Sequence, residues 1–202
     1  AMLMRGSVHR NRQQIADELD RLKAQIRVTG SAENLIVSIT TTKPKLPAVL
    51  ELLAEVLRSP AFDSQEFGKE VNEQITAYEE RRNEPANVAR NALLRHISPY
   101  PKGHPRYAAT IDEAIAEIKS LKIEDVRTFH RDFYGAVGQM ALVGDFDSKA
   151  VQTQLTRLLG EWKAPKNYQR IAQRLKKDLQ PLDIKLATPD KAQAIFLAAL
   201  PI

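Results

Sequence analysis

Apolar residues recur at helical spacing near the start of the chain. Residues 11–26 therefore predict an amphipathic helix, and Asn11 followed by Gln14 is a typical helix start. The apolar side of this helix is formed by Ile15, Leu19, Leu22 and Ile26. Residues 34–42 follow as a run rich in β-branched residues, which predicts a strand against which the helix can pack.

The middle of the chain predicts three more helices, each bounded by a capping residue or a proline. They cover residues 47–59, 63–84 and 88–96. Asp63 and Glu66 form the cap of the second of these helices. Residues 98–105 contain three prolines and a glycine, so they predict a surface loop.

The pattern after this loop is again mostly helical. Thr110 caps one helix, and residues 122–134 predict another whose inward side is formed by Val126, Phe129 and Phe133. Residues 139–143 predict a short buried strand. The last helix begins after Asp147 and ends at Gly160.

Several helices in succession, with strands at irregular places, favour an α+β fold in which an antiparallel sheet packs with the helices. We assign residues 1–162 to one domain. Residues 163–181 carry six basic residues and little apolar periodicity, so they predict an interdomain linker. Residues 182–202 contain two strand-like runs, 183–187 and 194–200, which we expect to begin a second domain that the chain does not complete.

Composition narrows the class of protein. Hydrophobic residues at 43% and charged residues at 27% of 202 are typical of a globular protein, and no apolar run predicts a membrane span. The absence of cysteine excludes disulfides and thiolate metal sites. The net charge of +5 raises nucleic-acid binding as a function, but 30 basic residues are interleaved with 25 acidic ones, which favours a solvated surface. We favour a periplasmic over a cytoplasmic location.

The histidines do not form a metal motif. His96 and His104 flank Tyr100, but eight residues and two prolines separate the imidazoles and no carboxylate accompanies them. We therefore expect loop or capping roles for them. His9 and His130 stand at polar positions close to helices, and we expect both at the surface.

Two charged groups also have simple explanations. Asp145 and Asp147 supply only two carboxylates without the spacing of a calcium loop, so we expect a turn and a helix cap. The second charged group consists of Glu79, Glu80, Arg81 and Arg82, and we expect it to be a solvated helix face. No catalytic, metal-binding or substrate-binding residue is assigned from these patterns.

The order and spacing of these pieces resemble the pitrilysin or insulinase type of zinc metallopeptidase, in its processing-peptidase form. The resemblance rests on short segments along the chain: Met2-Leu3-Met4-Arg5-Gly6-Ser7, Ser59-Pro60-Ala61-Phe62, Gly103-His104-Pro105, residues 129–134, Leu142-Val143-Gly144-Asp145-Phe146-Asp147 and Leu159-Gly160-Glu161-Trp162. It implies a processing-peptidase-like metallohydrolase domain that lacks its first strands.

In that family, a helix with His-x-x-Glu-His binds zinc, and a glutamate from a later long helix is the third ligand. The position of the second histidine would fall on Ala1, and that of the third ligand falls near Glu73 and Gln74, of which Gln74 matches better. Ser7 stands where threonine is usual. The resemblance therefore implies a non-catalytic half, inactive alone and without a cofactor, whose zinc is bound by a catalytic half in the parent or a partner.

Such a half would form one wall of a chamber for an extended peptide substrate, opposite a zinc-bearing half in the same chain or another chain. The family's substrate-gripping element, Arg-x-x-x-Gly-Leu-x-Tyr, does not occur in the sequence and would lie beyond Ile202. One alternative is a non-proteolytic scaffold or core subunit of the same fold. The other is a basic nucleic-acid-binding protein, which no sequence motif supports. We expect neither a nucleic-acid partner nor a membrane span.

Overall fold

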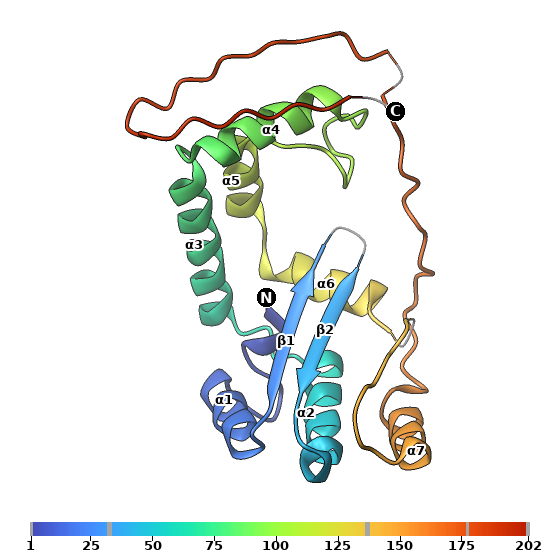
Figure 1. The fold of residues 1–202 in the computed structure, drawn as a ribbon. Coiled ribbons are helices and arrows are strands. Elements are labelled where there is room, and N and C mark those ends of the chain that lie inside the picture. Colours follow the sequence, from blue (N-terminus) through green and yellow to red (C-terminus); the bar gives the residue numbers. More distant parts are fainter. Residues whose placement is uncertain (1, 32–33, 136–137, 177, 201–202) are drawn as a thin grey trace. The chain divides into compact units, whose positions relative to one another are not determined.

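The computed structural model describes residues 2–31, 34–135, 138–176 and 178–200, and its elements are shown in Figure 1. Helices are combined with an antiparallel strand pair, which confirms the predicted α+β fold. Within the described residues, no helix is both long and apolar enough to cross a bilayer.

The chain divides into two compact units. The first consists of Ala1–Glu70 with Lys122–Arg170, and the second of Val71–Leu121 with Ile171–Ile202. Helix α3 (Ser64–Arg81) begins in the first unit and ends in the second. The assignment of residues 182–202 to a following domain stays a prediction.

Helix α2 (Leu46–Arg58) is the centre of the first unit and begins after a short 3-10 helix, η2 (Lys43–Lys45). Its apolar residues form three stripes that face three separate core clusters: Val49, Leu52 and Val56; Leu53 and Leu57; Leu50 and Ala54. Glu51, Glu55 and Arg58 form a narrow polar face on α2, and a helix that is apolar on most of its surface is largely buried. Val49 and Val56 accordingly have exposed fractions of 0%.

A different element packs against each apolar stripe of α2. Helix α1 (Arg12–Arg21) contributes Ile15 to the first cluster, and helix α7 (Ser148–Leu159) contributes Val151 and Leu158 to the third. The second cluster contains Met2 and Leu3 from the 3-10 helix η1 (Met2–Met4). Helices from both ends of the first unit's sequence therefore meet on α2.

Strands β1 (Gln25–Gly30) and β2 (Leu35–Thr40) pair antiparallel, with Val28 opposite Val37. The strand predicted over residues 34–42 is confirmed. Successive side chains of a strand point to opposite faces, so alternate residues reach the core. Those partly buried against the second cluster are Ile26, Val28, Val37 and Ile39.

The helix predicted over residues 11–26 is wrong at its end. Lys23 takes a left-handed φ of 48°, and the amide of Ala24 bonds back to the carbonyl of Leu19 at 3.0 Å. This is a Schellman-type ending, which usually carries glycine at the left-handed position. Because a lysine stands there, the sequence gives no stop signal, and Ile26 belongs to β1.

The strands predicted over residues 139–143, 183–187 and 194–200 are also wrong. None of these segments is a strand in the structure. Some of their apolar side chains are fully or nearly fully exposed, such as Val143 at 101% and Phe196 at 89%. A strand is stable only when its backbone groups pair with a neighbour. Among the residues that the structure describes, β1 and β2 form the only sheet.

Helix α6 (Ile123–Phe133) turns a different face inward from the one predicted. Val126 packs against the core, but Phe129 and Phe133 are 54% and 48% exposed, and their ring centroids lie 5.0 Å apart. The inward position is taken by His130, whose Nε2 lies 2.7 Å from the carbonyl oxygen of Leu57. The inward stripe therefore passes through Val126 and His130, four residues apart.

The second unit contains α4 (Pro85–Ile97) and α5 (Ile111–Ser120). Thr110 and Glu113 form a reciprocal cap at the start of α5, as predicted for Thr110. The carboxylate of Glu113 also pairs with Arg95 at 3.3 Å and Lys102 at 3.0 Å. The backbone amide of Thr110 and the ammonium of Lys102 lower the pKa of Glu113 to about 2. One carboxylate thus joins α4, α5 and the loop between them.

Candidate functional site

The N-terminal segment, residues 2–10, is the piece whose sequence resembles the end of a zinc-binding helix, so its surroundings are the first candidate site. Met2 and Leu3 are buried beside Phe62. Gly6 has a left-handed φ of 136°, which side chains rarely adopt, and its carbonyl accepts from the amide of Ala61 at 3.0 Å. The segment is therefore fixed against the turn between α2 and α3.

A buried ion-pair cluster holds the same segment on α3. The guanidinium of Arg5 contacts the carboxylate of Glu70 at 2.7 and 2.8 Å and that of Glu66 at 3.4 Å. Glu66 also pairs with Lys69 at 2.6 Å and Arg12 at 3.7 Å. Hydrogen bonds from Lys69 and then Arg5 hold the pKa of Glu66 below its usual value. This arrangement anchors the backbone.

Ser7 is also fully engaged. Its Oγ accepts from the backbone amides of His9 and Arg10 at 3.1 and 2.9 Å and donates to the carboxylate of Glu55. The residue is only 5% exposed. A buried hydroxyl with its bonds directed to a turn and a carboxylate shapes the backbone and is not placed as a nucleophile.

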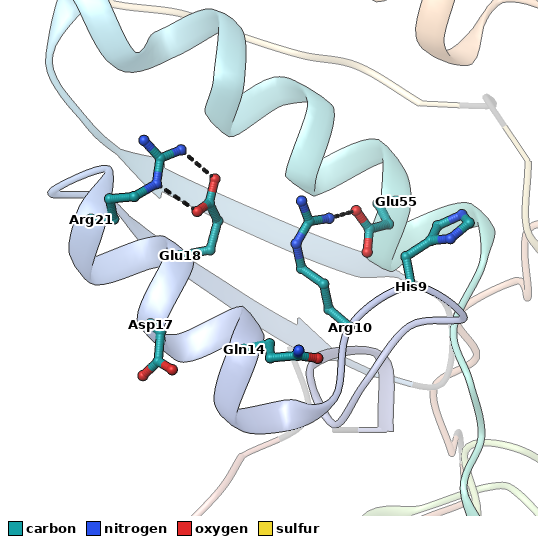
Figure 2. A pocket seen from close by; sticks show the side chains of 7 residues that line it. All are labelled: His9, Arg10, Gln14, Asp17, Glu18, Arg21 and Glu55. Carbon is teal, nitrogen blue, oxygen red and sulfur yellow. Dashed lines mark hydrogen bonds and ion pairs between the residues drawn. The ribbon is translucent and has the colours of Figure 1, made fainter.

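An open groove lies beside this turn, between the polar side of α1 and the end of α2 (Figure 2). It has a volume of about 570 Å³. The residues that line it are His9, Arg10, Gln14, Asp17, Glu18, Arg21 and Glu55. No sequence pattern predicts this groove, because its α1 residues have the ordinary spacing of a solvated helix face.

The charges of the groove are paired with one another. Arg21 makes two hydrogen bonds of 2.7 Å to Glu18, and Arg10 pairs with Glu55 (Figure 2). The hydrogen bond from Arg21 holds the pKa of Glu18 below its usual value. Asp17 accepts a hydrogen bond from Gln13 at 2.7 Å. Because two of the three anions in the groove are paired with its two arginines, the groove has no strong field of one sign to select a charged ligand, and we assign no reaction to it.

The positions that the resemblance gives to zinc ligands do not form a metal site in the described residues. Ala1 lies outside them. Glu73 and Gln74 are exposed on α3, and Gln74 supplies a carboxamide where a carboxylate would be needed. No three His, Cys, Asp or Glu side chains of the described ranges come together in a way that could hold a metal ion. Zinc therefore does not fit this donor set.

His104 has the loop role that its sequence context predicts, whereas His96 lies in the last turn of α4 and contacts the main chain of a distant segment. His96 Nε2 lies 2.9 Å from the carbonyl oxygen of Gln180, and His104 Nδ1 accepts from the amide of Arg106 at 3.0 Å. The ring of His104 stacks on Tyr100, with centroids 4.4 Å apart and an interplanar angle of 17°. These contacts order the loop that follows α4.

The other two histidines differ from each other. His9 is exposed, as predicted. The prediction for His130 is wrong, because its ring lies in an aromatic cluster with Phe62 at 5.3 Å and Tyr134 at 4.9 Å, and its nitrogen bonds the end of α2. His130 is therefore half-buried, and its hydrogen bond lowers the cost of removing the imidazole from water, which its polar sequence neighbours did not reveal.

The two aspartates near α7 bind protein groups. Asp147 accepts from the amide of Ala150 at 3.0 Å and caps α7, as predicted. Asp145 forms an ion pair of 2.7 Å with Lys43. Neither contact requires a metal ion.

The charged group at the end of α3 is largely a solvated face, since Glu79, Glu80 and Arg81 are exposed. Arg82 makes further contacts, because it pairs with Glu79 at 2.6 Å and with Asp112 of α5 at 2.8 Å. It therefore contributes to the packing of the second unit.

Many solved structures are similar to this chain, among them the following two. One is described as the inactive domain of a peptidase M16 from Pseudomonas fluorescens; it is 22% identical, has a TM-score of 0.69, and the match covers 85% of this chain and 42% of that one. The other is described as a protease from Helicobacter pylori, with 20% identity, a TM-score of 0.66, and coverage of 87% of this chain and 43% of that one. This chain thus spans less than half the length of these neighbours.

Comparison with curated protein sequences found no match. The sequence profile of the family described as Insulinase (Peptidase family M16) matches residues 1–106, which is more than half of the 202 residues. Together with the family resemblance of the N-terminal segment and the shared fold, this match shows that the chain belongs to the insulinase family of peptidases, M16.

Proposed function

We propose that the chain is a non-catalytic half of an M16 zinc peptidase, which forms one wall of a peptide-binding chamber opposite a zinc-bearing half. The observation that carries the proposal is the residue at the third-ligand position. Gln74 is a carboxamide, exposed on α3, and a neutral amide is a poor zinc ligand. The fold neighbour from Pseudomonas fluorescens is described as an inactive domain, which is consistent with this role.

The zinc of such a peptidase would be bound by the other half, where it lowers the pKa of a bound water and polarises the scissile carbonyl. This chain would contribute shape and contacts to the bound peptide. Its described residues carry paired ions, capping groups and a buried core, which are features of a stable wall. A scaffold subunit of the same fold would have the same features, so activity of the assembled complex distinguishes the two functions.

The test combines the chain with a zinc-bearing partner. The purified chain, an M16 protein with His-x-x-Glu-His from the same organism, and their mixture are each incubated with an unstructured peptide and zinc, and products are measured by mass spectrometry. We expect no cleavage by the chain alone and chelator-sensitive cleavage that increases in the mixture. Cleavage by the chain alone would contradict the non-catalytic assignment, and an unchanged rate in the mixture would contradict the chamber role.

A further inference from the structure

An extended segment of the second unit, residues 171–176 and 178–180, lies against the loop that follows α4. The Tyr100 hydroxyl donates to the carbonyl of Ala172 at 3.2 Å and accepts from the amide of Arg174 at 2.8 Å. In an extended chain, a carbonyl and the amide two residues later face the same side, where a neighbouring strand would pair with them. One phenol therefore occupies the place of a strand partner.

Two more side chains hold the ends of the segment. The guanidinium of Arg106 donates to the carbonyl of Ile171 at 3.4 Å, and the imidazole of His96 lies 2.9 Å from the carbonyl oxygen of Gln180. Each of these bonds reaches the main chain. These three side chains therefore recognise an extended backbone, and one side chain of the segment adds to the contact, since Lys176 Nζ donates to the carbonyl of His96 at 3.1 Å.

The phenol is also held by contacts that do not involve the segment. Its ring stacks on His104 at a centroid distance of 4.4 Å, and His104 is itself fixed by the amide of Arg106, which donates to Nδ1 at 3.0 Å. These contacts lie within the loop. A group held in place by its own loop loses little freedom when it binds, which favours binding.

We propose that Tyr100, His96 and Arg106 form a backbone latch, a binding site for extended polypeptide that residues 171–176 and 178–180 occupy from within the chain. The latch makes the second part of the predicted linker a docked extended segment of the second unit. Arg174 and Lys176 remain exposed at the surface while the backbone is held. Release of the latch frees the segment and opens the same site to another extended backbone.

The first test is hydrogen exchange of the full chain with Tyr100→Phe, which keeps the ring and removes the hydroxyl. Loss of a hydrogen bond changes an opening equilibrium by a factor of about 5, so loss of both raises exchange of the Arg174 amide by about 25-fold. Tyr168→Phe is the matched control, because Tyr168 is 58% exposed and the same atom is removed. Equal exchange in wild type and Tyr100→Phe would overturn the latch, as would an equal rise in Tyr168→Phe.

A second measurement separates release from misfolding. Trypsin cleaves after Arg174 and Lys176 only when the segment leaves the latch, so we expect Tyr100→Phe and His96→Ala to shorten the half-life of these bonds while the helical circular dichroism stays at the wild-type level. Cleavage at the wild-type rate in both variants would contradict the proposal. A second outcome would also overturn the proposal: loss of the helical signal in Tyr100→Phe, with cleavage at these two bonds no faster relative to the other trypsin sites. Tyr100 would then have a general structural role.

Discussion

Substitution of Arg5 tests how the N-terminal segment is held on α3. In Arg5→Met the side chain keeps most of its aliphatic length and loses the guanidinium. The pair that is broken is largely removed from water, since the side chains of Arg5, Glu70 and Glu66 are 9%, 11% and 15% exposed. The substitution therefore leaves the Glu70 carboxylate in a poorly hydrated place without this cation.

The size of the stability loss in Arg5→Met follows from the surroundings of the two carboxylates. Breaking a buried ion pair by removal of one partner costs about 3–5 kcal/mol. Glu66 keeps Lys69 at 2.6 Å and Arg12 at 3.7 Å, so its part of the loss is small and the cost arises mainly at Glu70. We therefore expect the lower end of the range, a loss of about 3 kcal/mol in the free energy of unfolding.

Urea unfolding followed by the fluorescence of Trp162 measures this loss. Trp162 is the only tryptophan and packs against the cluster that contains Met2 and Leu3, so it reports on the first unit. Arg21→Met is the matched control: its pair with Glu18 is at the surface, where such pairs contribute less than about 1 kcal/mol.

The double substitution Arg5→Met with Glu70→Leu completes the cycle. Replacement of a whole buried pair by apolar residues is often close to neutral, so we expect the double variant within about 1 kcal/mol of wild type. A loss below about 1 kcal/mol for Arg5→Met, or a double variant less stable than the single one, would refute the reasoning.

Three further predictions concern the core, a cap and a titration. Leu53→Ala should lower the free energy of unfolding by about 3 kcal/mol because Leu53 is 2% exposed, whereas Leu94→Ala, at 46% exposure, should cost less than about 1 kcal/mol; equal losses in urea unfolding would contradict this. Asp147→Ala should lower the free energy of unfolding by about 1 kcal/mol through loss of the α7 cap, and Asp147→Ser should lower it much less. Unchanged stability of both variants in urea unfolding would contradict this role of Asp147. The pKa of Glu113 should be about 2 by carboxyl NMR titration, below the ordinary 4.5, so its ionised form stabilises the start of α5 above about pH 4.5 and this contribution is lost as pH falls toward 2; a measured value near 4.5 would show that the cap and Lys102 do not act on it.

Local signals in the sequence were reliable where they reflect local chemistry. The reciprocal cap of Asn11 and Gln14, the cap at Asp147 and the apolar stripes of α2 are all present, because each depends on residues within one or two turns of helix. The end of α1 was missed for the opposite reason. Lys23 adopts the left-handed conformation that ends the helix, a position where glycine would have marked the end in the sequence.

Tertiary contacts explain the remaining differences. The run at 139–143 has strand-forming residues, but strand formation depends on a neighbour that no local pattern encodes. His130 looked like a surface residue until the carbonyl of Leu57 and the rings around it were placed beside it. The groove of Figure 2 is completed by Glu55 of α2, and Tyr100 contacts the carbonyl of Ala172; both contacts join residues that are distant in the sequence, so periodicity could not find them.

The measurement that tests the central claim most directly is the zinc content of the purified chain after equilibration with zinc and removal of the excess. A family member with His-x-x-Glu-His, treated in the same way, is the positive control. With Gln74 at the third-ligand position, we predict a ratio of zinc to protein far below one, against about one in the control. A ratio near one in this chain would contradict the non-catalytic assignment.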